Sequence, residues 1–184
     1  MGAMTIDTGV PLGRALTVDD LEALPDDGLR HELIDGVHVV SAAPIPLHQR
    51  VNFKLCRALD DAAPEHLWVV PPIDVVLARD TVLEPDVVVA PRDQLTGKRL
   101  DGPPLLAIEV LSPSTALIDL NTKYARLERA AAPHYWVVDP VAPRLIAWEL
   151  RDGAYVQVAD VSGEETWTAQ RPFPVAICPA RLVE

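Results

Sequence analysis

The stretch Leu105-Leu106-Ala107-Ile108-Glu109-Val110-Leu111 is an apolar run interrupted by a single carboxylate. A short apolar run of this kind predicts a buried central strand. A buried carboxylate without a partner costs several kcal/mol or stays protonated. Glu109 therefore needs a nearby cation, or it must reach water at the end of the strand. The alternative is an ordinary strand-end glutamate that is solvated or paired with an arginine.

A second acidic residue stands at the start of the preceding strand, in Glu84-Pro85-Asp86-Val87-Val88-Val89-Ala90. The connection 91–104 allows antiparallel pairing, and if Ala90 lies opposite Leu105, Asp86 lies opposite Glu109. Directly opposed side chains share a face, so two carboxylates would repel each other there. A divalent cation removes this conflict, and oxygen ligands suit Mg²⁺ or Mn²⁺. The alternative is a Pro-Asp turn before a strand with a different register.

The rest of the chain predicts a mixed α/β (α+β) domain. Asp35-Gly36 between two short runs indicates a hairpin, and Thr17 with Asp20 indicates a helix start before Pro25. Longer helices are expected over 46–63 and 116–131 from the apolar period. Strands are expected at 31–34, 37–41, 67–70, 73–78, 86–90, 105–111, 135–138, 145–150 and 155–158. We expect one domain, 4–184, with a central mixed sheet flanked by helices and a β-rich C-terminal part, after residues 1–3 left from cloning.

Lys123 is one of only three lysines in a chain with thirteen arginines. A lysine in such a background is a weak sign that a compact ammonium group is needed. Asp119 lies four residues earlier on the same predicted helix. A plain ion pair on the helix surface is therefore the alternative interpretation.

These motifs together resemble the PD-(D/E)xK nuclease superfamily and, more closely, the Uma-two family of bacterial restriction endonucleases. The resemblance covers most of the chain in the family's order. The matching stretches are Glu32-Leu33-Ile34-Asp35-Gly36, Pro46-x-His48, Glu84-Pro85-Asp86-Val87, Glu109-Val110-Leu111-Ser112-Pro113-Ser114, Asp119 to Lys123, and Tyr135-Trp136-Val137-Val138-Asp139-Pro140. Val37 and His134 depart from the family's usual residues, and neither touches the predicted metal site.

The resemblance implies a restriction-endonuclease-like core in which Asp86 and Glu109 bind the metal and Glu32 adds a third carboxylate. Leu111 occupies the position of the superfamily's usual lysine, so the resemblance assigns that role to Lys123. This lysine would orient the attacking water or offset charge in the transition state. His48 falls where the family often has a histidine, and its alternative is a helix-start histidine bonded to backbone.

Composition limits the partners of this protein. The net charge of −11 and the pI near 4.8 argue against nucleic acid, which usually binds a basic surface. Phosphate contacts need only a local footprint, however. Two basic stripes are candidates, although each is more often a solvated helix face. They are Arg50, Lys54 and Arg57 on one predicted helix, and Arg126 and Arg129 on the other.

The apolar runs are too short for a spanning helix, and no signal peptide is visible. Cys56 and Cys178 are expected to be two buried thiols in a reducing compartment, which suits the cytoplasm, and the alternative is one disulfide. The leading hypothesis is a cytoplasmic, Mg²⁺-dependent endonuclease that hydrolyses DNA, with Mn²⁺ as a second possible ion. The alternatives are an inactive nuclease-fold module that binds or regulates, and a metallohydrolase with another substrate. Nothing in the pattern decides between a monomer and a homodimer.

Overall fold

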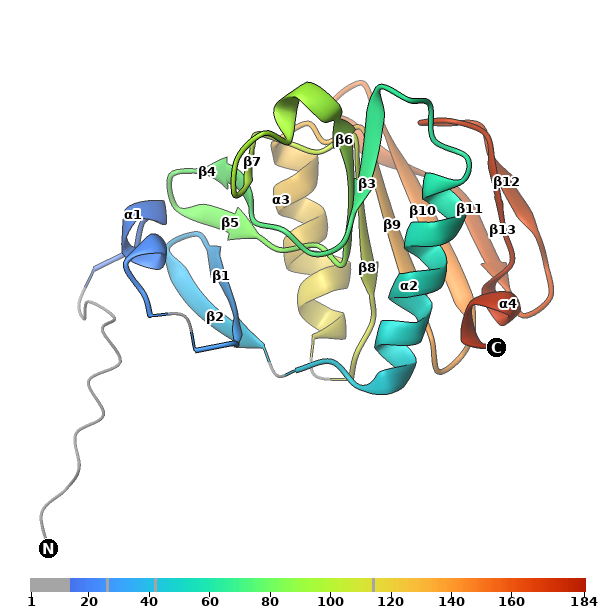
Figure 1. The fold of residues 1–184 in the computed structure, drawn as a ribbon, viewed down its shortest axis with the longest axis horizontal. Coiled ribbons are helices and arrows are strands. Elements are labelled where there is room, and N and C mark those ends of the chain that lie inside the picture. The colour runs from blue at the N-terminus through green and yellow to red at the C-terminus, as the bar shows by residue number, and fades with distance from the viewer. Residues whose placement is uncertain (1–13, 26, 42, 114) are drawn as a thin grey trace, which may run out of the picture.

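A computed structural model describes residues 14–25, 27–41, 43–113 and 115–184. The predicted cloning remnant, residues 1–3, lies outside the described residues. The described part contains a six-stranded sheet, a five-stranded sheet and a two-stranded ribbon, with helices packed on the larger sheet (Figure 1). The architecture is the mixed α+β arrangement that the sequence predicts.

The larger sheet has the strand order β11-β10-β9-β8-β6-β3. Only β8 and β9 run parallel, and the other pairs are antiparallel. The strands are β3 (Leu67–Val70), β6 (Val87–Pro91), β8 (Leu106–Val110), β9 (His134–Asp139), β10 (Arg144–Arg151) and β11 (Ala154–Ser162).

The larger sheet packs against helices on both faces. Successive residues of a strand point to opposite faces, so β8 contributes to two separate cores. Leu106, Ile108 and Val110 of β8 pack in one core with Val51 and Leu55 of α2 (Pro46–Asp60). Ala107 of β8 belongs to the other core, which contains Leu127 of α3 (Tyr124–Arg129). Glu109 therefore lies on the α3 side of β8, the same side as Ala107.

The smaller sheet has the order β2-β1-β5-β4-β7 and carries the N-terminal hairpin. Asp35 (φ 51°) and Gly36 (φ 77°) form the predicted two-residue turn, which requires positive φ. A Cβ atom at Gly36 would lie 2.6 Å from Cβ of Ala15, so only glycine fits there. The strands are β1 (Arg30–Ile34), β2 (Val37–Ser41), β4 (Val75–Ala78), β5 (Thr81–Leu83) and β7 (Leu100–Asp101).

Several elements depart from the predicted ones. The predicted helix over 116–131 is a π-helical turn, η2 (Ile118–Lys123), followed by α3. The second sheet was not foreseen, because β5 and β7 are too short to show a period. Four further elements were also missed: η1 (Arg92–Gln94), β12 (Trp167–Ala169), β13 (Val175–Ile177) and α4 (Pro179–Val183).

The remaining predictions of local structure are confirmed. α1 (Val18–Glu22) begins after Thr17, whose backbone N–H donates to the Asp20 carboxylate at 2.8 Å. Cys56 and Cys178 are both free thiols. Among the described helices, none combines the length and the apolar character that a membrane crossing requires.

Candidate active site

Strands β6 and β8 pair in the predicted register. Val87 faces Ile108, and Val89 faces Leu106. One further step places Asp86 opposite Glu109, at the end of the pair where the chain enters β6 and leaves β8. The alternative of a turn with a shifted register is therefore wrong. Leu111, at the position of the superfamily's usual lysine, lines the same pocket as Glu109.

Lys123 is the centre of a buried cluster of carboxylates. Its Nζ lies 2.8 Å from Oε1 of Glu32, 3.0 Å from Oε1 of Glu109 and 3.4 Å from Oδ1 of Asp119. The Lys123 side chain is only 2% exposed, as are its three partners. The interpretation of Lys123 and Asp119 as a surface ion pair is therefore wrong, because η2 turns both side chains inward.

Asp86 receives donors from three different elements. The backbone N–H of Val110 donates to Oδ2 at 2.7 Å, and Nε2 of His48 on α2 lies 3.1 Å from the same oxygen. Nη2 of Arg30 on β1 donates to Oδ1 at 3.0 Å. Burial by itself raises the pKa of Asp86, but the His48 contact and the Arg30 charge outweigh it. The pKa of Asp86 is therefore lowered, and the group is a stable carboxylate.

The pKa of Glu109 is shifted in the opposite direction. Its side chain is buried, and this burial raises its pKa well above the ordinary value. Lys123 opposes the shift, while the charges of Asp119 and Asp86 add to it. Lys123 itself keeps a raised pKa despite its burial, because Glu109, Glu32 and Asp119 surround it. Burial thus disfavours the charged form of Glu109, while the surrounding carboxylates favour the charged form of Lys123.

Arg30 and Glu84 support the cluster from the smaller sheet, and neither was singled out from the sequence. Arg30 donates to the backbone carbonyl of Glu84 and to Asp86. The backbone N–H of Glu84 donates to Oε1 of Glu32 at 2.8 Å. Arg30 precedes Glu32 by two residues in β1, so both point to the same face. The i, i+2 spacing of Arg30 and Glu32 could have indicated a shared face. It gives no indication of the partner of Arg30, Asp86, which lies 56 residues away.

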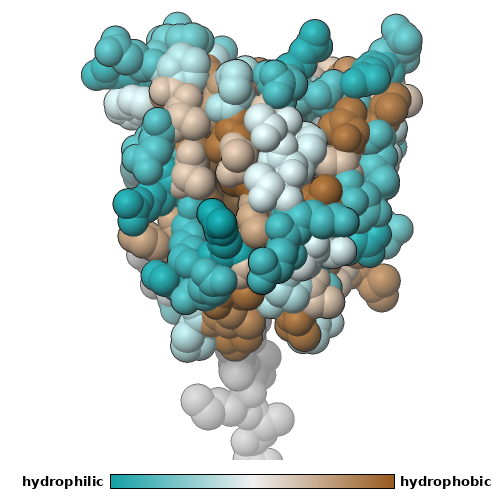
Figure 2. Space-filling model, turned by 90° about the vertical axis from the view of Figure 1, so that its right-hand side faces the viewer, coloured by the Kyte–Doolittle hydropathy of each residue, from teal (hydrophilic) through white to brown (hydrophobic). Residues whose placement is uncertain are grey.

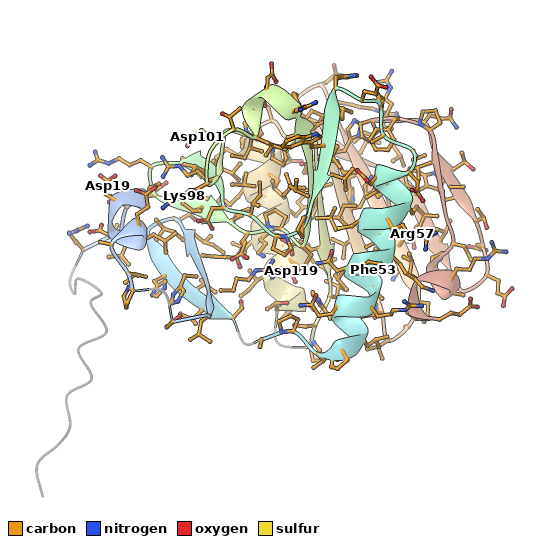
Figure 3. The ribbon with its side chains drawn as sticks, viewed as in Figure 1. Asp19, Phe53, Arg57, Lys98, Asp101 and Asp119 are labelled. Atoms are coloured by element: carbon orange, nitrogen blue, oxygen red, sulfur yellow. The ribbon has the colours of Figure 1, made fainter. Side chains whose placement is uncertain are left out.

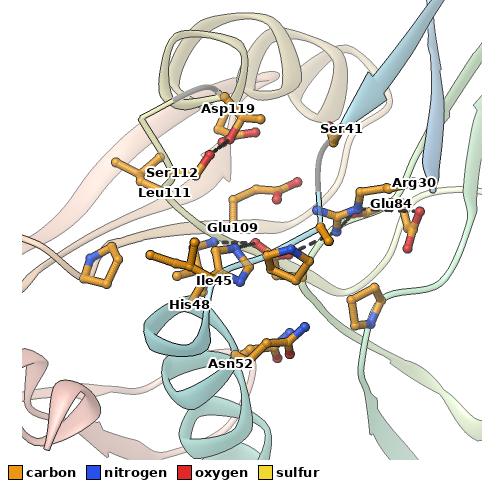
Figure 4. A pocket seen from close by; sticks show the side chains of 18 of the residues that line it. Arg30, Ser41, Ile45, His48, Asn52, Glu84, Glu109, Leu111, Ser112 and Asp119 are labelled. Atoms are coloured by element: carbon orange, nitrogen blue, oxygen red, sulfur yellow. Dashed lines mark hydrogen bonds and ion pairs between the residues drawn. The ribbon is translucent and has the colours of Figure 1, made fainter. Parts of the chain in front are cut away.

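The cluster opens into a pocket with a volume of about 440 Å³ (Figure 4). Asp86, Glu109, Asp119 and Lys123 line it, together with His48. The alternative for His48, a bond to backbone, does not appear, since its Nε2 faces Asp86. Its buried Nδ1 has no hydrogen-bond partner among the residues that the structure describes.

A divalent cation fits the chemistry of this donor set. Asp86 and Glu109 would supply hard oxygen ligands from neighbouring strands, and Mg²⁺ is commonly held by one or two carboxylates with water completing the shell. Across the described ranges, no three His, Cys, Asp or Glu side chains are grouped to hold a metal ion. The protein would thus contribute two carboxylates rather than a complete cage. Arg30 donates to Asp86, and Lys123 donates to Glu109.

Comparison with known proteins agrees with this geometry. A family model named Uma2, described as "Putative restriction endonuclease", matches residues 18–181. The chain belongs to the Uma2 family. A crystal structure titled as a putative nuclease belonging to DUF820, from Anabaena variabilis ATCC 29413, has a TM-score of 0.75 and 15% sequence identity. The match covers 91% of this chain and 97% of that one, which shows a shared restriction-endonuclease-like fold. No curated protein matches the sequence.

Proposed function

We propose that this Uma2 protein is a Mg²⁺-dependent endonuclease that hydrolyses phosphodiester bonds of DNA, with Mn²⁺ as an alternative ion. One observation carries the proposal. Two facing strands bring Asp86 and Glu109 together beside the buried ammonium of Lys123, in a pocket that is open to a ligand. Family membership supports a nuclease as the general class.

The charge balance of the site supports the binding of a divalent cation. Five acidic side chains meet two permanent cations, Arg30 and Lys123, so negative charge is in excess. The raised pKa of Glu109 is a direct consequence of burial together with this excess. A bound divalent cation would supply positive charge that stabilises the ionised Glu109 and polarises a phosphate oxygen of the substrate. The five acids are Glu32, Glu84, Asp86, Glu109 and Asp119.

The other residues of the cluster have separate tasks. Lys123 holds a fixed positive charge beside Glu109, where it can orient a water molecule or offset charge that develops on the phosphate. Glu32 positions Lys123 and is itself held by the backbone N–H of Glu84. Arg30 and His48 hold Asp86. Each group is in place before substrate binds, which reduces the reorganisation needed during reaction.

The test is cleavage of supercoiled plasmid and of single-stranded DNA with Mg²⁺ or Mn²⁺. Glu109→Ala and Asp86→Ala should each reduce the rate by about a hundredfold or more, because each removes a metal ligand. Glu65→Ala is the matched control, since Glu65 is an exposed acid outside the pocket. Cleavage that persists unchanged in Glu109→Ala would refute the proposal.

The net charge of −11 favours a second candidate, an inactive nuclease-fold module that binds or regulates without turnover. The same assay separates the two. Stable DNA binding by the wild type, without cleavage under any divalent cation, would assign the chain to the module class.

A further inference from the structure

A second groove lies on the outer side of α2, between this helix, α4 and β13, with a volume of about 380 Å³. We propose that this groove binds the sugar-phosphate backbone of a single-stranded nucleic acid and that Phe53 stacks on one of its bases. The inference rests on the proposed function, because it names where the substrate strand would be held outside the pocket of Asp86 and Glu109.

The groove concentrates positive charge in an acidic protein. Four cationic side chains line it against one acidic side chain, Asp61, so its formal charge is +3 while the whole chain carries −11. Arg57 and Asp61 are 3.7 Å apart, and both side chains are about three-quarters exposed. Such a pair is worth little, so a phosphate can compete for Arg57. The four cations are Arg50, Lys54, Arg57 and Arg181.

Lys54 connects the two helices that line the groove. Its Nζ donates to the backbone carbonyl of Arg181 at 2.6 Å, so it ties α2 to α4. This contact fixes the distance between the two cationic walls. Arg50 and Arg57 remain on α2 as exposed guanidinium groups. They lie seven residues apart, so they project from the same side of the helix.

Phe53 gives the groove its preference for an unpaired strand. It is 60% exposed, and Figure 3 shows it on α2 near Arg57. Arg50 lies three residues before Phe53, and Arg57 four residues after it. An aromatic ring between phosphate-binding cations is the arrangement that proteins use for single strands, since any unpaired base can stack on it. A base inside a duplex has both faces covered by its neighbours and offers no face to Phe53.

The surroundings of the groove favour a charged ligand over an apolar partner. The side of the molecule that carries β12, β13 and α4 is mostly hydrophilic, with hydrophobic side chains in small separate patches (Figure 2). A protein-docking surface would show a larger continuous hydrophobic area. An acidic peptide could satisfy the cations, but it has no base to stack on Phe53.

The groove also lies next to the candidate active site along α2. Gln49 lines the pocket that holds Glu109, and Phe53 lines the groove. Residues four apart on a helix have Cβ atoms about 5–6 Å apart. A strand bound along the groove would therefore need to cross only the N-terminal half of α2 to place a neighbouring phosphate in the pocket.

The experiment measures fluorescence anisotropy of a labelled single-stranded oligonucleotide in EDTA, so that no cleavage occurs. Arg50→Gln/Arg57→Gln should weaken binding by about tenfold or more and lower the slope of log affinity against log salt by about 1.4. The matched control, Lys98→Gln/Arg151→Gln, removes two exposed cations outside the groove. Phe53→Leu should also weaken binding by about tenfold, while Phe53→Tyr keeps it.

Each outcome decides the matter. Equal loss in both double variants would show general electrostatic attraction and overturn the groove. Full affinity in Phe53→Leu, or equal affinity of the groove for polyglutamate, would point to an acidic peptide and overturn the stacking. No binding by the wild type would also overturn the groove. The plasmid assay with Glu109→Ala tests catalysis independently, so a failed groove and a failed nuclease are distinguishable.

Discussion

The ends of β6 and β8 lie side by side, yet they hold their carboxyl groups in opposite states. Asp86 at the end of β6 receives a backbone N–H, a histidine and an arginine, and its pKa is lowered. Glu109 at the end of β8 has Lys123 as its cation, and its pKa is raised well above the ordinary value. The donors at Asp86 thus outweigh its burial, whereas Lys123 alone does not outweigh the burial of Glu109.

A single pair of strands thus holds two carboxyl groups whose pKa values are shifted in opposite directions. Groups whose environments separate their pKa values usually divide the acid and base roles of a site. The lowered pKa of Asp86 favours its carboxylate form without any added positive charge. Added positive charge favours the charged form of Glu109, so metal binding at this site should be accompanied by proton release.

The largest expected effect comes from Lys123, the cation on the Glu109 side. Lys123→Met leaves three buried carboxyl groups without their shared partner and should lower the free energy of unfolding by about 3–5 kcal/mol. Urea denaturation measures this loss. Lys123→Met should also reduce cleavage by about a hundredfold, because it removes a fixed positive charge from the site. That loss must be measured at a temperature where the variant is folded.

Two controls test that interpretation. Lys98→Met changes an exposed lysine and should alter stability by no more than about 0.5 kcal/mol. Adding Glu109→Gln to Lys123→Met removes one of the uncompensated acids and should recover part of the stability. A loss of unfolding free energy in Lys123→Met as small as that in Lys98→Met would mean that Lys123 is exposed to solvent rather than buried.

The burial of Lys123 also shows where sequence reasoning reached its limit. The register of β6 and β8 could be predicted, because setting the end of one apolar run, Ala90, opposite the start of the next, Leu105, fixes it. The spacing of Asp119 and Lys123 predicted a surface pair, because an α-helical period was assumed where the chain forms a π-helical turn. Nothing in the local sequence distinguishes a π-helical turn from an α-helical one at this segment.

Contacts between residues far apart in the sequence could not be predicted either. Arg30 meets Asp86 only because the hairpin of β1 and β2 belongs to a second sheet, which is completed by β5 and β7. These two strands have three and two residues, too few for an alternating pattern. The candidate site could thus be predicted as a set of acids and a lysine, but the contacts that hold each acid required the tertiary structure.

A middle-sized effect is expected from the metal. Mn²⁺ at about a hundred times its dissociation constant should stabilise the wild type by about 2.7 kcal/mol and raise the melting temperature by several degrees. Asp86→Ala and Glu109→Ala should lose this increment, and the exposed-acid control Glu65→Ala should keep it. An equal rise in all four proteins would place the ion away from these strands and remove the basis of the comparison.

The smallest effect is a difference in pH dependence between the two carboxyl groups, measured without metal by urea denaturation from pH 5 to 8. Asp86 has a lowered pKa when folded, so its stabilising contribution is present above the unfolded pKa near 3.9 and is lost only at lower pH. Asp86→Asn should therefore destabilise by a similar amount across this range. Glu109 has a raised pKa, so the folded protein binds more protons here than the unfolded chain, and stability falls as pH rises. Glu109→Gln lacks that proton, and its stability relative to wild type should increase with pH, by at most about 1.4 kcal/mol per unit. A flat difference for Glu109→Gln would show that Lys123 already neutralises Glu109, and the two strand ends would then be electrostatically alike.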